Sequence, residues 1–518
     1  MMRSSPPTEP TNRGLEWLLV TLVFLLFASQ MPPEVNEPNY LAKARHYWDL
    51  AWCADDFFLN SADAHAPFYL GFGWLLLYLP MEAVAWIGRA FTCGVLAFGW
   101  VKLTSSLTRQ VGVAIVAATL MLGLNTFFQF SGEWVAGGFE GKGLAYGFIF
   151  WAIAEITQNR WNRGWILLGI ASIFHVVVGG WACVAATIGW FMLGRKSDRP
   201  TLRSQLWAIA LGFVISLIGL WPGLQLGGQT TTAETGQAAS IQVFSRLPHH
   251  LNPGQFFFAA DFPYLTPAAM RFLALVILWS LLAKRQKAIP ALRRLDSFTA
   301  GTLWIAALGL CLSLATRDHP ALAARLLQFY WFRLADVIVP ASCGLSLAYH
   351  LSREHVLRRA PVRLAVVLGS ALILMVPLYA LYQAEGIPPA DRKFTPHRKE
   401  FDDWRAVCAA AREVSPPDAL FLTPKYAHTI KWYAQRGEVG TWKEMPQDAA
   451  SILEWNDRLA KMHLWGADGI LPLAERSAAE LRALGKQYGA NFLLTRSSPP
   501  LALPMLYRND SFILYRIF

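Results

Sequence analysis

The feature that most constrains this chain is a series of apolar stretches, each close to the length of a membrane-spanning helix, separated by polar gaps. A spanning helix needs about 20 mainly apolar residues, and somewhat shorter helices are tolerated. This rule predicts about eleven spans, near residues 15–32, 82–104, 109–130, 143–158, 164–178, 180–194, 205–225, 267–284, 298–316, 322–350 and 362–384. With 54% hydrophobic residues, 16% charged residues and a mean hydropathy of +0.32, the chain has more apolar surface than one soluble core can bury. We therefore expect a polytopic α-helical membrane protein.

The positions of the basic residues predict how the chain is oriented. Lysine and arginine collect in the gaps at residues 102–109, 160–163, 195–203, 284–294 and 353–363. If the N-terminus is cytoplasmic, all of these gaps fall on the cytoplasmic side, as the positive-inside rule requires. The net charge of +11 is thus explained by topology and gives no reason to expect nucleic-acid binding. An odd number of spans places the C-terminus in the periplasm of a bacterial inner membrane.

Composition divides the chain into a membrane domain, residues 1–384, and a soluble domain, residues 400–518. The polar outer loops of the membrane domain are expected at residues 32–81, 131–143 and 225–263. Residues 385–399 are rich in proline and charge, as in a tether. In the soluble part, helical spacing at residues 401–413, 448–459 and 477–488 alternates with short apolar runs at 419–423 and 491–495, and a hairpin is expected across 508–511. This alternation predicts a small periplasmic α/β domain.

The first outer loop holds the main candidates for chemistry. Glu37 follows the first span closely, and a carboxylate at the membrane rim is partly desolvated, which raises its pKa and suits a general base. The alternative is that Glu34 and Glu37 are solvated loop acids. Asp55 and Asp56 offer hard oxygen ligands for a divalent cation, or they cap a helix.

The order of motifs in this region resembles the GT-C glycosyltransferases, membrane enzymes similar to the protein mannosyltransferases and the aminoarabinose transferase of lipid A. The motifs are Glu37-Pro38-Asn39-Tyr40, an amphipathic run at 41–48, Asp55-Asp56-Phe57-Phe58, Pro67-Phe68-Tyr69, and Ala85-Trp86-Ile87-Gly88-Arg89. The resemblance implies a GT-C-like membrane fold, a sugar donor linked to a polyprenyl phosphate, and an outer-loop acid that acts as base or binds metal. It matches Glu37 to that acid, with Asp55 or Asp56 as a second match. Where the family often has a basic residue and two prolines before the aromatic pair, this chain has His65, Ala66 and Pro67.

Other polar residues on the outer side are candidates for substrate binding. Glu140 and Lys142 lie in a glycine-rich turn that suits a phosphate, or that is simply a tight turn with solvated charges. His175, beside Gly179 and Gly180, is expected to line a depression between two short helices. His249 and His250, with Asp261 nearby, suit a metal or a sugar, or are plain exposed loop residues.

Arginines near the tenth predicted span, residues 322–350, are candidates for binding a lipid phosphate. Arg317 and Arg325 lie at its outer mouth, and Arg333 lies deeper. Arg333 and Asp336, three residues apart, alternatively form a buried pair.

The favoured function is transfer of a sugar from a polyprenyl-phosphate donor to a lipid, glycan or protein acceptor at the outer face of the membrane, with inversion at the sugar. A divalent cation is a candidate cofactor, and nucleic acid is not expected as a partner. The alternatives are a transporter or lipid flippase, which also has charged residues within spans, and a membrane-anchored binding or assembly protein.

Overall fold

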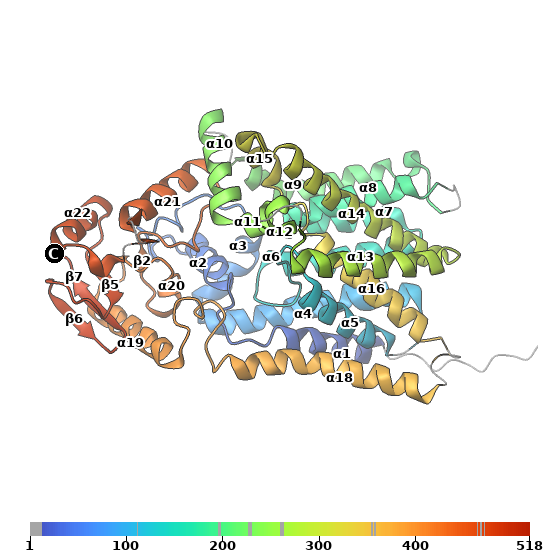
Figure 1. Cartoon of the computed structure of the whole chain (residues 1–518), viewed down its shortest axis with the longest axis horizontal. Helices are drawn as coiled ribbons and strands as arrows, with labels where there is room; N and C mark the ends of the chain where they lie inside the picture. The colour runs from blue at the N-terminus through green and yellow to red at the C-terminus, as the bar shows by residue number, and fades with distance from the viewer. Residues whose placement is uncertain are drawn as a thin grey trace, which may run out of the picture.

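The computed structural model describes residues 13–110, 112–194, 198–225, 230–259, 264–353, 356, 359–463, 465–466, 469–470 and 472–518. Figure 1 shows a long helical bundle with a smaller domain containing a sheet at one end, and the C-terminus lies at the far side of that domain. The predicted fold class, an α-helical membrane protein with a small C-terminal α/β domain, is confirmed.

A helix lies at each predicted span. These helices are α1 (Arg13–Phe27), α4 (Met81–Leu107), α5 (Val113–Phe128), α6 (Gly141–Thr157), α7 (Trp161–Phe174), α8 (Val176–Met192), α9 (Leu206–Gln225), α13 (Pro267–Gln286), α14 (Pro290–Ala315), α16 (Ala335–Leu351) and α18 (Ala360–Gln383). Within the described residues, five helices are long and apolar enough by themselves to cross a membrane: α4, α9, α13, α14 and α18. Of the basic residues expected on the cytoplasmic side, Arg195, Lys196 and Arg358 lie outside the described residues.

The bundle packs through small residues, as expected where lipid gives no hydrophobic drive for helices to associate. A Cβ atom on Gly99 of α4 would lie 2.1 Å from the carbonyl oxygen of Gly147 on α6. A Cβ on Gly169 of α7 would likewise lie 2.2 Å from the carbonyl oxygen of Gly212 on α9. Only glycine permits these backbone approaches, so larger side chains would separate both helix pairs.

One predicted span is wrong in its shape. Residues 322–350 are not a single helix, because α15 (Pro320–Leu327) ends and α16 begins only at Ala335. Tyr330, between them, has a φ of 56°, which an α-helix cannot contain. The break leaves Arg333 in a turn at the end of the bundle nearest the sheet domain, which we call the outer end because the predicted outer loops lie there, instead of deep within a span.

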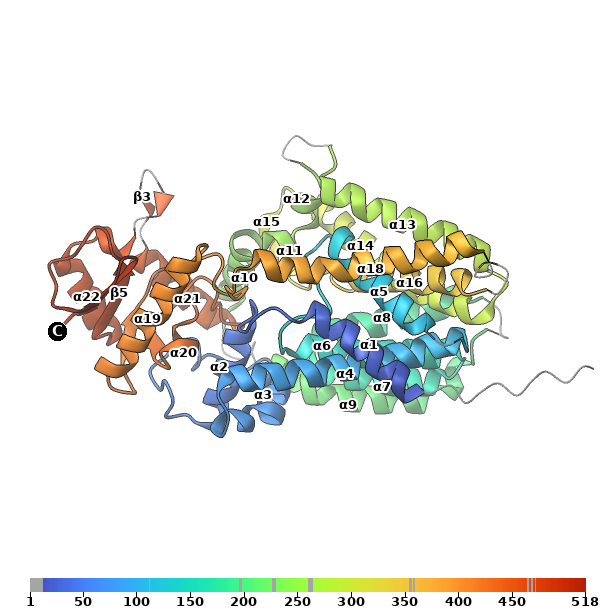
Figure 2. The ribbon, with the colours of Figure 1, turned by 90° about the horizontal axis from the view of Figure 1, so that it is seen from below.

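The remaining short helices gather at the same end of the bundle as the sheet domain (Figures 1 and 2). They are α2 (Glu37–Trp48), α3 (Ala66–Phe72), α10 (Thr232–Ser240), α11 (Pro248–Leu251) and α12 (Pro253–Phe257). The described parts of the predicted outer loops 32–81 and 225–263 therefore lie at the same end of the bundle.

The C-terminal domain follows the predicted alternation. Its helices are α19 (Arg398–Val414), α20 (Ile430–Tyr433), α21 (Ala449–Met462) and α22 (Ala478–Tyr488), and its strands are β1 (Leu420–Leu422), β2 (Gly437–Glu438), β3 (Trp465–Gly466), β4 (Gly469–Ile470), β5 (Phe492–Arg496), β6 (Met505–Arg508) and β7 (Phe512–Arg516). The main sheet has the order β2-β1-β5-β7-β6, in which β2, β1 and β5 are parallel and β7 is antiparallel to both its neighbours.

Both faces of this sheet are covered, since successive side chains of a strand point to opposite sides. Leu420 and Leu422 pack in one core with Trp455 of α21, whereas Phe421 packs in another with Trp404 of α19. Residues 385–399 also differ from a free tether. Ile387, Phe394 and Asp391 of this segment are buried, and Asp391 accepts hydrogen bonds from Thr429 and Tyr433 of the domain.

Candidate functional site

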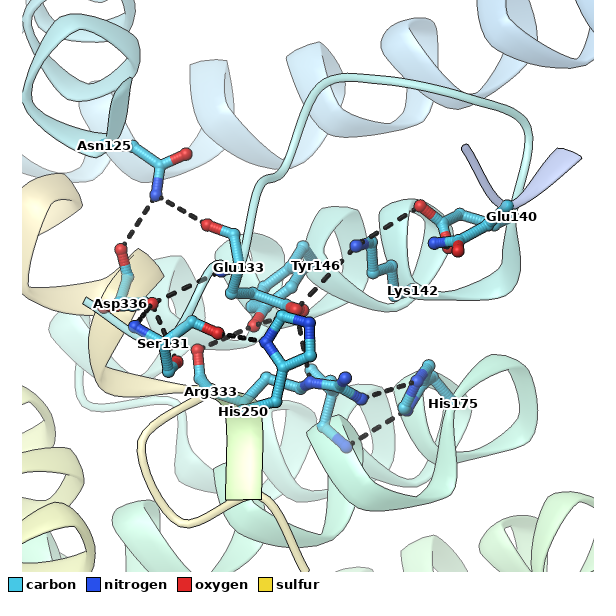
Figure 3. A network of polar contacts seen from close by, with 12 residues as sticks. Asn125, Ser131, Glu133, Glu140, Lys142, Tyr146, His175, His250, Arg333 and Asp336 are labelled. Atoms are coloured by element: carbon cyan, nitrogen blue, oxygen red, sulfur yellow. Dashed lines mark hydrogen bonds and ion pairs between the residues drawn. The ribbon is translucent and has the colours of Figure 1, made fainter. Parts of the chain in front are cut away.

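A group of charged side chains that contact one another lies at the outer end of the bundle (Figure 3). The group forms where α6 meets the turns that precede α6, α8 and α16. Nε of Arg333 is 3.2 Å from Oε2 of Glu133. Nζ of Lys142 is 3.8 Å from the same Glu133 oxygen and 3.3 Å from Oε1 of Glu140. The hydroxyl of Tyr146 donates to Glu133 at 3.4 Å. We call this the Glu133 cluster: Glu133, Glu140, Lys142, Tyr146, His175 and Arg333.

The position of Glu133 is fixed by Asp336 in the first turn of α16. The buried Asp336 carboxylate accepts backbone N–H bonds from Phe130, Ser131 and Glu133 and a hydroxyl bond from Ser131. Asn125 donates to the carbonyl oxygens of both Glu133 and Asp336, at 3.0 and 2.9 Å. The alternative reading of Arg333 and Asp336 as an ion pair is therefore wrong, because Arg333 pairs with Glu133 and Asp336 holds the loop backbone.

Two histidines extend the Glu133 cluster toward the first outer loop. His175 caps α8 by accepting the Val178 N–H, and its Nε2 lies 3.4 Å from Arg333 Nη1. The ring of His65 is 5.6 Å from that of His175, and its Nε2 is 3.1 Å from the Tyr40 hydroxyl. Burial, with the charge of Arg333, lowers the pKa of His65 to about 4, so this imidazole is neutral at pH 7.

The contacts of Glu37 do not fit the predicted general base. Its carboxylate is fully buried and receives two bonds from Arg89, at 2.7 and 2.5 Å, and backbone N–H bonds from Glu34 and Phe139, at 2.7 and 2.8 Å. Every acceptor position is thus occupied. Glu37 is also the first residue of α2 and directly precedes Pro38. Its geometry is that of a buried pair that anchors α2 to α4.

Glu34 is the acid in this loop with a free oxygen. Its Oε2 is buried and has no hydrogen-bond partner in the part of the chain that the structure describes. Burial, together with the negative charges of Glu140 and Glu37, raises the pKa of Glu34 to about 7. A carboxyl group with a pKa near the working pH, beside Lys142 and Glu140, is suited to accept a proton.

Asp55 and Asp56 do not form the predicted metal site. Asp55 is exposed, while Asp56 is buried, accepts the Leu59 N–H and lies 2.9 Å from Nζ of Lys431. Nζ of Lys431 also lies 2.9 Å from Glu438 and 2.8 Å from Glu444. The ammonium group of Lys431 therefore occupies the position that a metal ion would take between these carboxylates. Within the described ranges, no group of three or more His, Cys, Asp or Glu is arranged to hold a metal ion. We call Asp56, Lys431, Glu438 and Glu444 the Lys431 cluster.

The other predicted residues are divided between this site and the surface. His250 contacts the carbonyl oxygen of Ser131, beside the Glu133 cluster, and stacks on the exposed His249. Arg317 and Arg325 are exposed, and Arg325 donates to the Thr232 carbonyl at 3.3 Å. They stay candidates for lipid headgroups at the outer surface but lie outside the Glu133 cluster. Asp261 lies outside the described residues.

Sequence reasoning missed Glu133 and Tyr146 and gave Glu34 only a minor role. Glu133 lies in the same outer loop as Glu140, and two acids in one short apolar-flanked loop were a usable signal. Lys443 and Gln447 of the C-terminal domain also reach the site, and no local pattern marks them. Asn39 donates to the Lys443 carbonyl at 3.2 Å, and the Gln447 amide nitrogen is 3.3 Å from His65 Nε2.

An apolar groove of about 510 Å³ runs along the bundle between α7, α8 and α9. Its lining includes Val176, which directly follows His175, and extends to Trp190 toward the opposite end of α8. Phe191 and Phe213 in its walls are largely exposed, so the groove opens on the lipid-facing side. One end therefore lies next to the Glu133 cluster.

Comparisons with known proteins give limited matches. A family model described as "Domain of unknown function (DUF6798)" matches residues 402–462. No curated protein sequence matches the chain significantly. Among solved structures, the archaeal oligosaccharyltransferase AglB from Archaeoglobus fulgidus, in complex with an inhibitory peptide and a dolichol-phosphate, is 12% identical, with a TM-score of 0.48, and the match covers 93% of this chain and 69% of that one. A second structure of an Archaeoglobus fulgidus oligosaccharyltransferase, with Zn and sulfate, is 12% identical over 93% of this chain and 67% of that one, with a TM-score of 0.42.

Proposed function

We propose that this protein transfers a sugar from a polyprenyl-phosphate donor to a lipid, glycan or protein acceptor at the outer face of a bacterial inner membrane. The observation that carries the proposal is an apolar, lipid-facing groove whose lining begins at Val176, the residue after His175 of the Glu133 cluster. A long isoprenoid chain suits such a groove, and the cations beside it suit a phosphate.

In this proposal the donor phosphate lies against Arg333 and Lys142. These groups are held by Glu133 and Glu140, so they are positioned before the substrate arrives. Glu34 removes the proton from the acceptor hydroxyl or amine as the acceptor atom bonds to the anomeric carbon. The bond from that carbon to the phosphate oxygen breaks, and the polyprenyl phosphate leaves as an anion stabilised by Arg333. Attack opposite the leaving phosphate inverts the sugar.

Matched carboxylate variants test the role of Glu34. Glu34→Gln should preserve the fold and the binding of polyprenyl phosphate but lower the transfer rate on the order of 100-fold, as loss of a general base does. The control is Glu82→Gln, at an exposed acid of α4. The measurement is transfer from a polyprenyl-phosphate sugar in vesicles, and equal rates for both variants would remove Glu34 from the mechanism.

A binding measurement tests the donor site separately. Arg333→Gln should weaken polyprenyl-phosphate binding, measured by native mass spectrometry, by about tenfold or more, since it removes a charge-assisted contact. Arg285→Gln, at an exposed position in the last turn of α13, is the matched arginine variant. If the two variants bind equally well, the donor phosphate does not lie at the Glu133 cluster.

A further inference from the structure

A second group of basic side chains lies where three separate parts of the chain meet. Arg246 is the last residue of the π-helix Ile241–Arg246, which precedes α11. Lys393 comes from the segment that precedes α19, and Lys425 and Lys443 come from the loops that follow β1 and β2. We call these four residues the basic cluster. No residue of the basic cluster belongs to the Glu133 cluster.

The cations of the basic cluster gather around two aromatic rings. Nζ of Lys425 is 4.6 Å from the centre of the Trp442 ring, and the Arg246 guanidinium carbon is 5.5 Å from it. Arg246 also donates to the Trp442 carbonyl at 2.9 Å. Nζ of Lys393 is 4.3 Å from the centre of the Tyr426 ring. Trp442 is thus a flat surface flanked by positive charge.

Three cations of the basic cluster have no acidic partner in the part of the chain that the structure describes. Across the described ranges, none of Arg246, Lys393 and Lys443 forms an ion pair. Burial and the charge of Arg246 lower the pKa of Lys443 to about 8, against the opposing influence of Glu34 and Glu140. Burying like charges together is unfavourable, and an anion placed among them would relieve the cost.

The position of the basic cluster separates it from the donor groove. The loops after β1 and β2 lie at the carboxyl ends of parallel strands, the edge at which open sheets bind ligands. This edge faces the membrane domain, since Asn39 bonds to Lys443 and Gln447 approaches His65. The groove instead begins at Val176, within the bundle. A molecule that enters from the aqueous side would meet the basic cluster near Glu34.

We propose that Arg246, Lys425 and Lys443 bind a phosphate or carboxylate group of the acceptor, with a sugar ring on Trp442, so that the acceptor is an anionic glycan or glycolipid. This inference rests on the proposed transferase function, because it places the anion beside the base that would activate the acceptor. The same three cations would also bind the second phosphate of a diphosphate donor. The experiment below distinguishes an anion of the acceptor from an anion of the donor.

The probe is inorganic pyrophosphate, titrated by calorimetry into the full-length protein in detergent. Lys443→Gln should raise the dissociation constant about tenfold, as loss of one charge-assisted contact does. Its Nζ donates no hydrogen bond among the described residues, so the fold should persist, and a thermal melt checks this. The matched control is Lys461→Gln on α21, which should bind as the wild type does. Unchanged binding in Lys443→Gln overturns the proposal.

A pH series gives a second readout. The charged and titratable groups that face Lys443 are Arg246, Lys142, Glu34, Glu140, His249 and His428. Because Lys443 loses its proton above about pH 8, wild-type pyrophosphate binding should weaken from pH 7 to 9, and this change should be smaller in Lys443→Gln. An equal change in both proteins contradicts the role of Lys443.

Vesicles that contain polyprenyl monophosphate or diphosphate distinguish the source of the anion. If Lys443→Gln binds both lipids as well as the wild type but binds pyrophosphate poorly, the anion belongs to the acceptor. Weaker binding of the diphosphate lipid alone would assign the basic cluster to the donor and overturn the inference. Failure of the wild type to bind either lipid would instead count against the transferase itself, whatever pyrophosphate does.

Discussion

Four carboxylates near the outer end of the bundle differ in chemistry because they differ in partners. Glu37 is saturated by Arg89 and two backbone N–H groups. Glu133 and Glu140 share Lys142. Glu34 alone of these four keeps a buried oxygen without a partner in the described structure. The surroundings of each glutamate, and not its residue type, therefore decide its role. Glu37 anchors α2, Glu133 and Glu140 hold the cations, and Glu34 is the proposed base.

Replacement of Glu37 should affect stability first. Glu37→Gln leaves Arg89 as an uncompensated buried charge, which costs about 3–5 kcal/mol of unfolding free energy. Thermal melting in detergent should show a clear loss relative to Glu82→Gln, whose side chain is exposed. If Glu37→Gln melts like the wild type and yet transfers no sugar, Glu37 is the base after all.

The raised pKa of Glu34 predicts how transfer depends on pH. The group is protonated below about pH 7 and cannot then accept a proton. The transfer rate at saturating donor should therefore fall as pH decreases from 8 to 6 and should level off above the pKa. Glu34→Gln should lack this dependence, and a variant that keeps the wild-type profile would assign the titration to another group.

At the scale of elements, the site depends on junctions between helices. The loop before α6 is held by Asp336 of α16, and the break between α15 and α16 brings Arg333 to Glu133. Helix ends and turns carry the Glu133 cluster, apart from Tyr146, which lies within α6. This is the expected place for irregular backbone at membrane depth, where protein surrounds it.

The variant Asp336→Asn tests this support. An asparagine offers one acceptor oxygen to the donors of Phe130, Ser131 and Glu133, so the loop should shift and Glu133 should move from Arg333. We expect transfer to fall by about 100-fold, as small displacements at a reacting site can cause. Asp318→Asn, at an exposed position, is the control and should retain full activity.

The Lys431 cluster joins the first outer loop to the C-terminal domain. Lys431→Met leaves Asp56, Glu438 and Glu444 buried without their cation, which should cost about 3–5 kcal/mol and undock the loop. Cys53, now buried near Asp56, should then react with maleimide, as peptide mass spectrometry can detect. Lys399→Met, on the exposed surface, should leave Cys53 protected, and equal labelling in both variants would contradict the prediction.

At the scale of the whole molecule, every polar outer loop and the C-terminal domain lie at one end of the bundle (Figure 2). We predict that this end faces the periplasm. A cysteine introduced at exposed Asp55 or at Phe518 should react with an impermeant thiol reagent in intact cells, while one at Lys287 should react only after lysis. Labelling at Lys287 in intact cells would reverse the topology.

The sequence alone determined where the apolar helices of the bundle lie, apart from the break within residues 322–350, and the alternation in the C-terminal domain. Both are local properties, because a helix in lipid satisfies its own backbone hydrogen bonds and a strand's pattern repeats every second residue. The strands at Leu420–Leu422 and Phe492–Arg496 and the helix α22 lie where local patterns predicted them.

The tertiary structure decided which charges meet. Glu37 and Arg89 are 52 residues apart, and Asp56 and Lys431 are 375 apart, so no local pattern links either pair. Sequence reasoning assigned chemistry to Glu37 and Asp56 because they are acids at a membrane rim, but burial beside Arg89 and Lys431 satisfies both carboxylates. Glu34, three residues from Glu37 and of the same residue type, keeps an unpaired oxygen only because the chain folds Gly138 and Glu140 against it without supplying a donor.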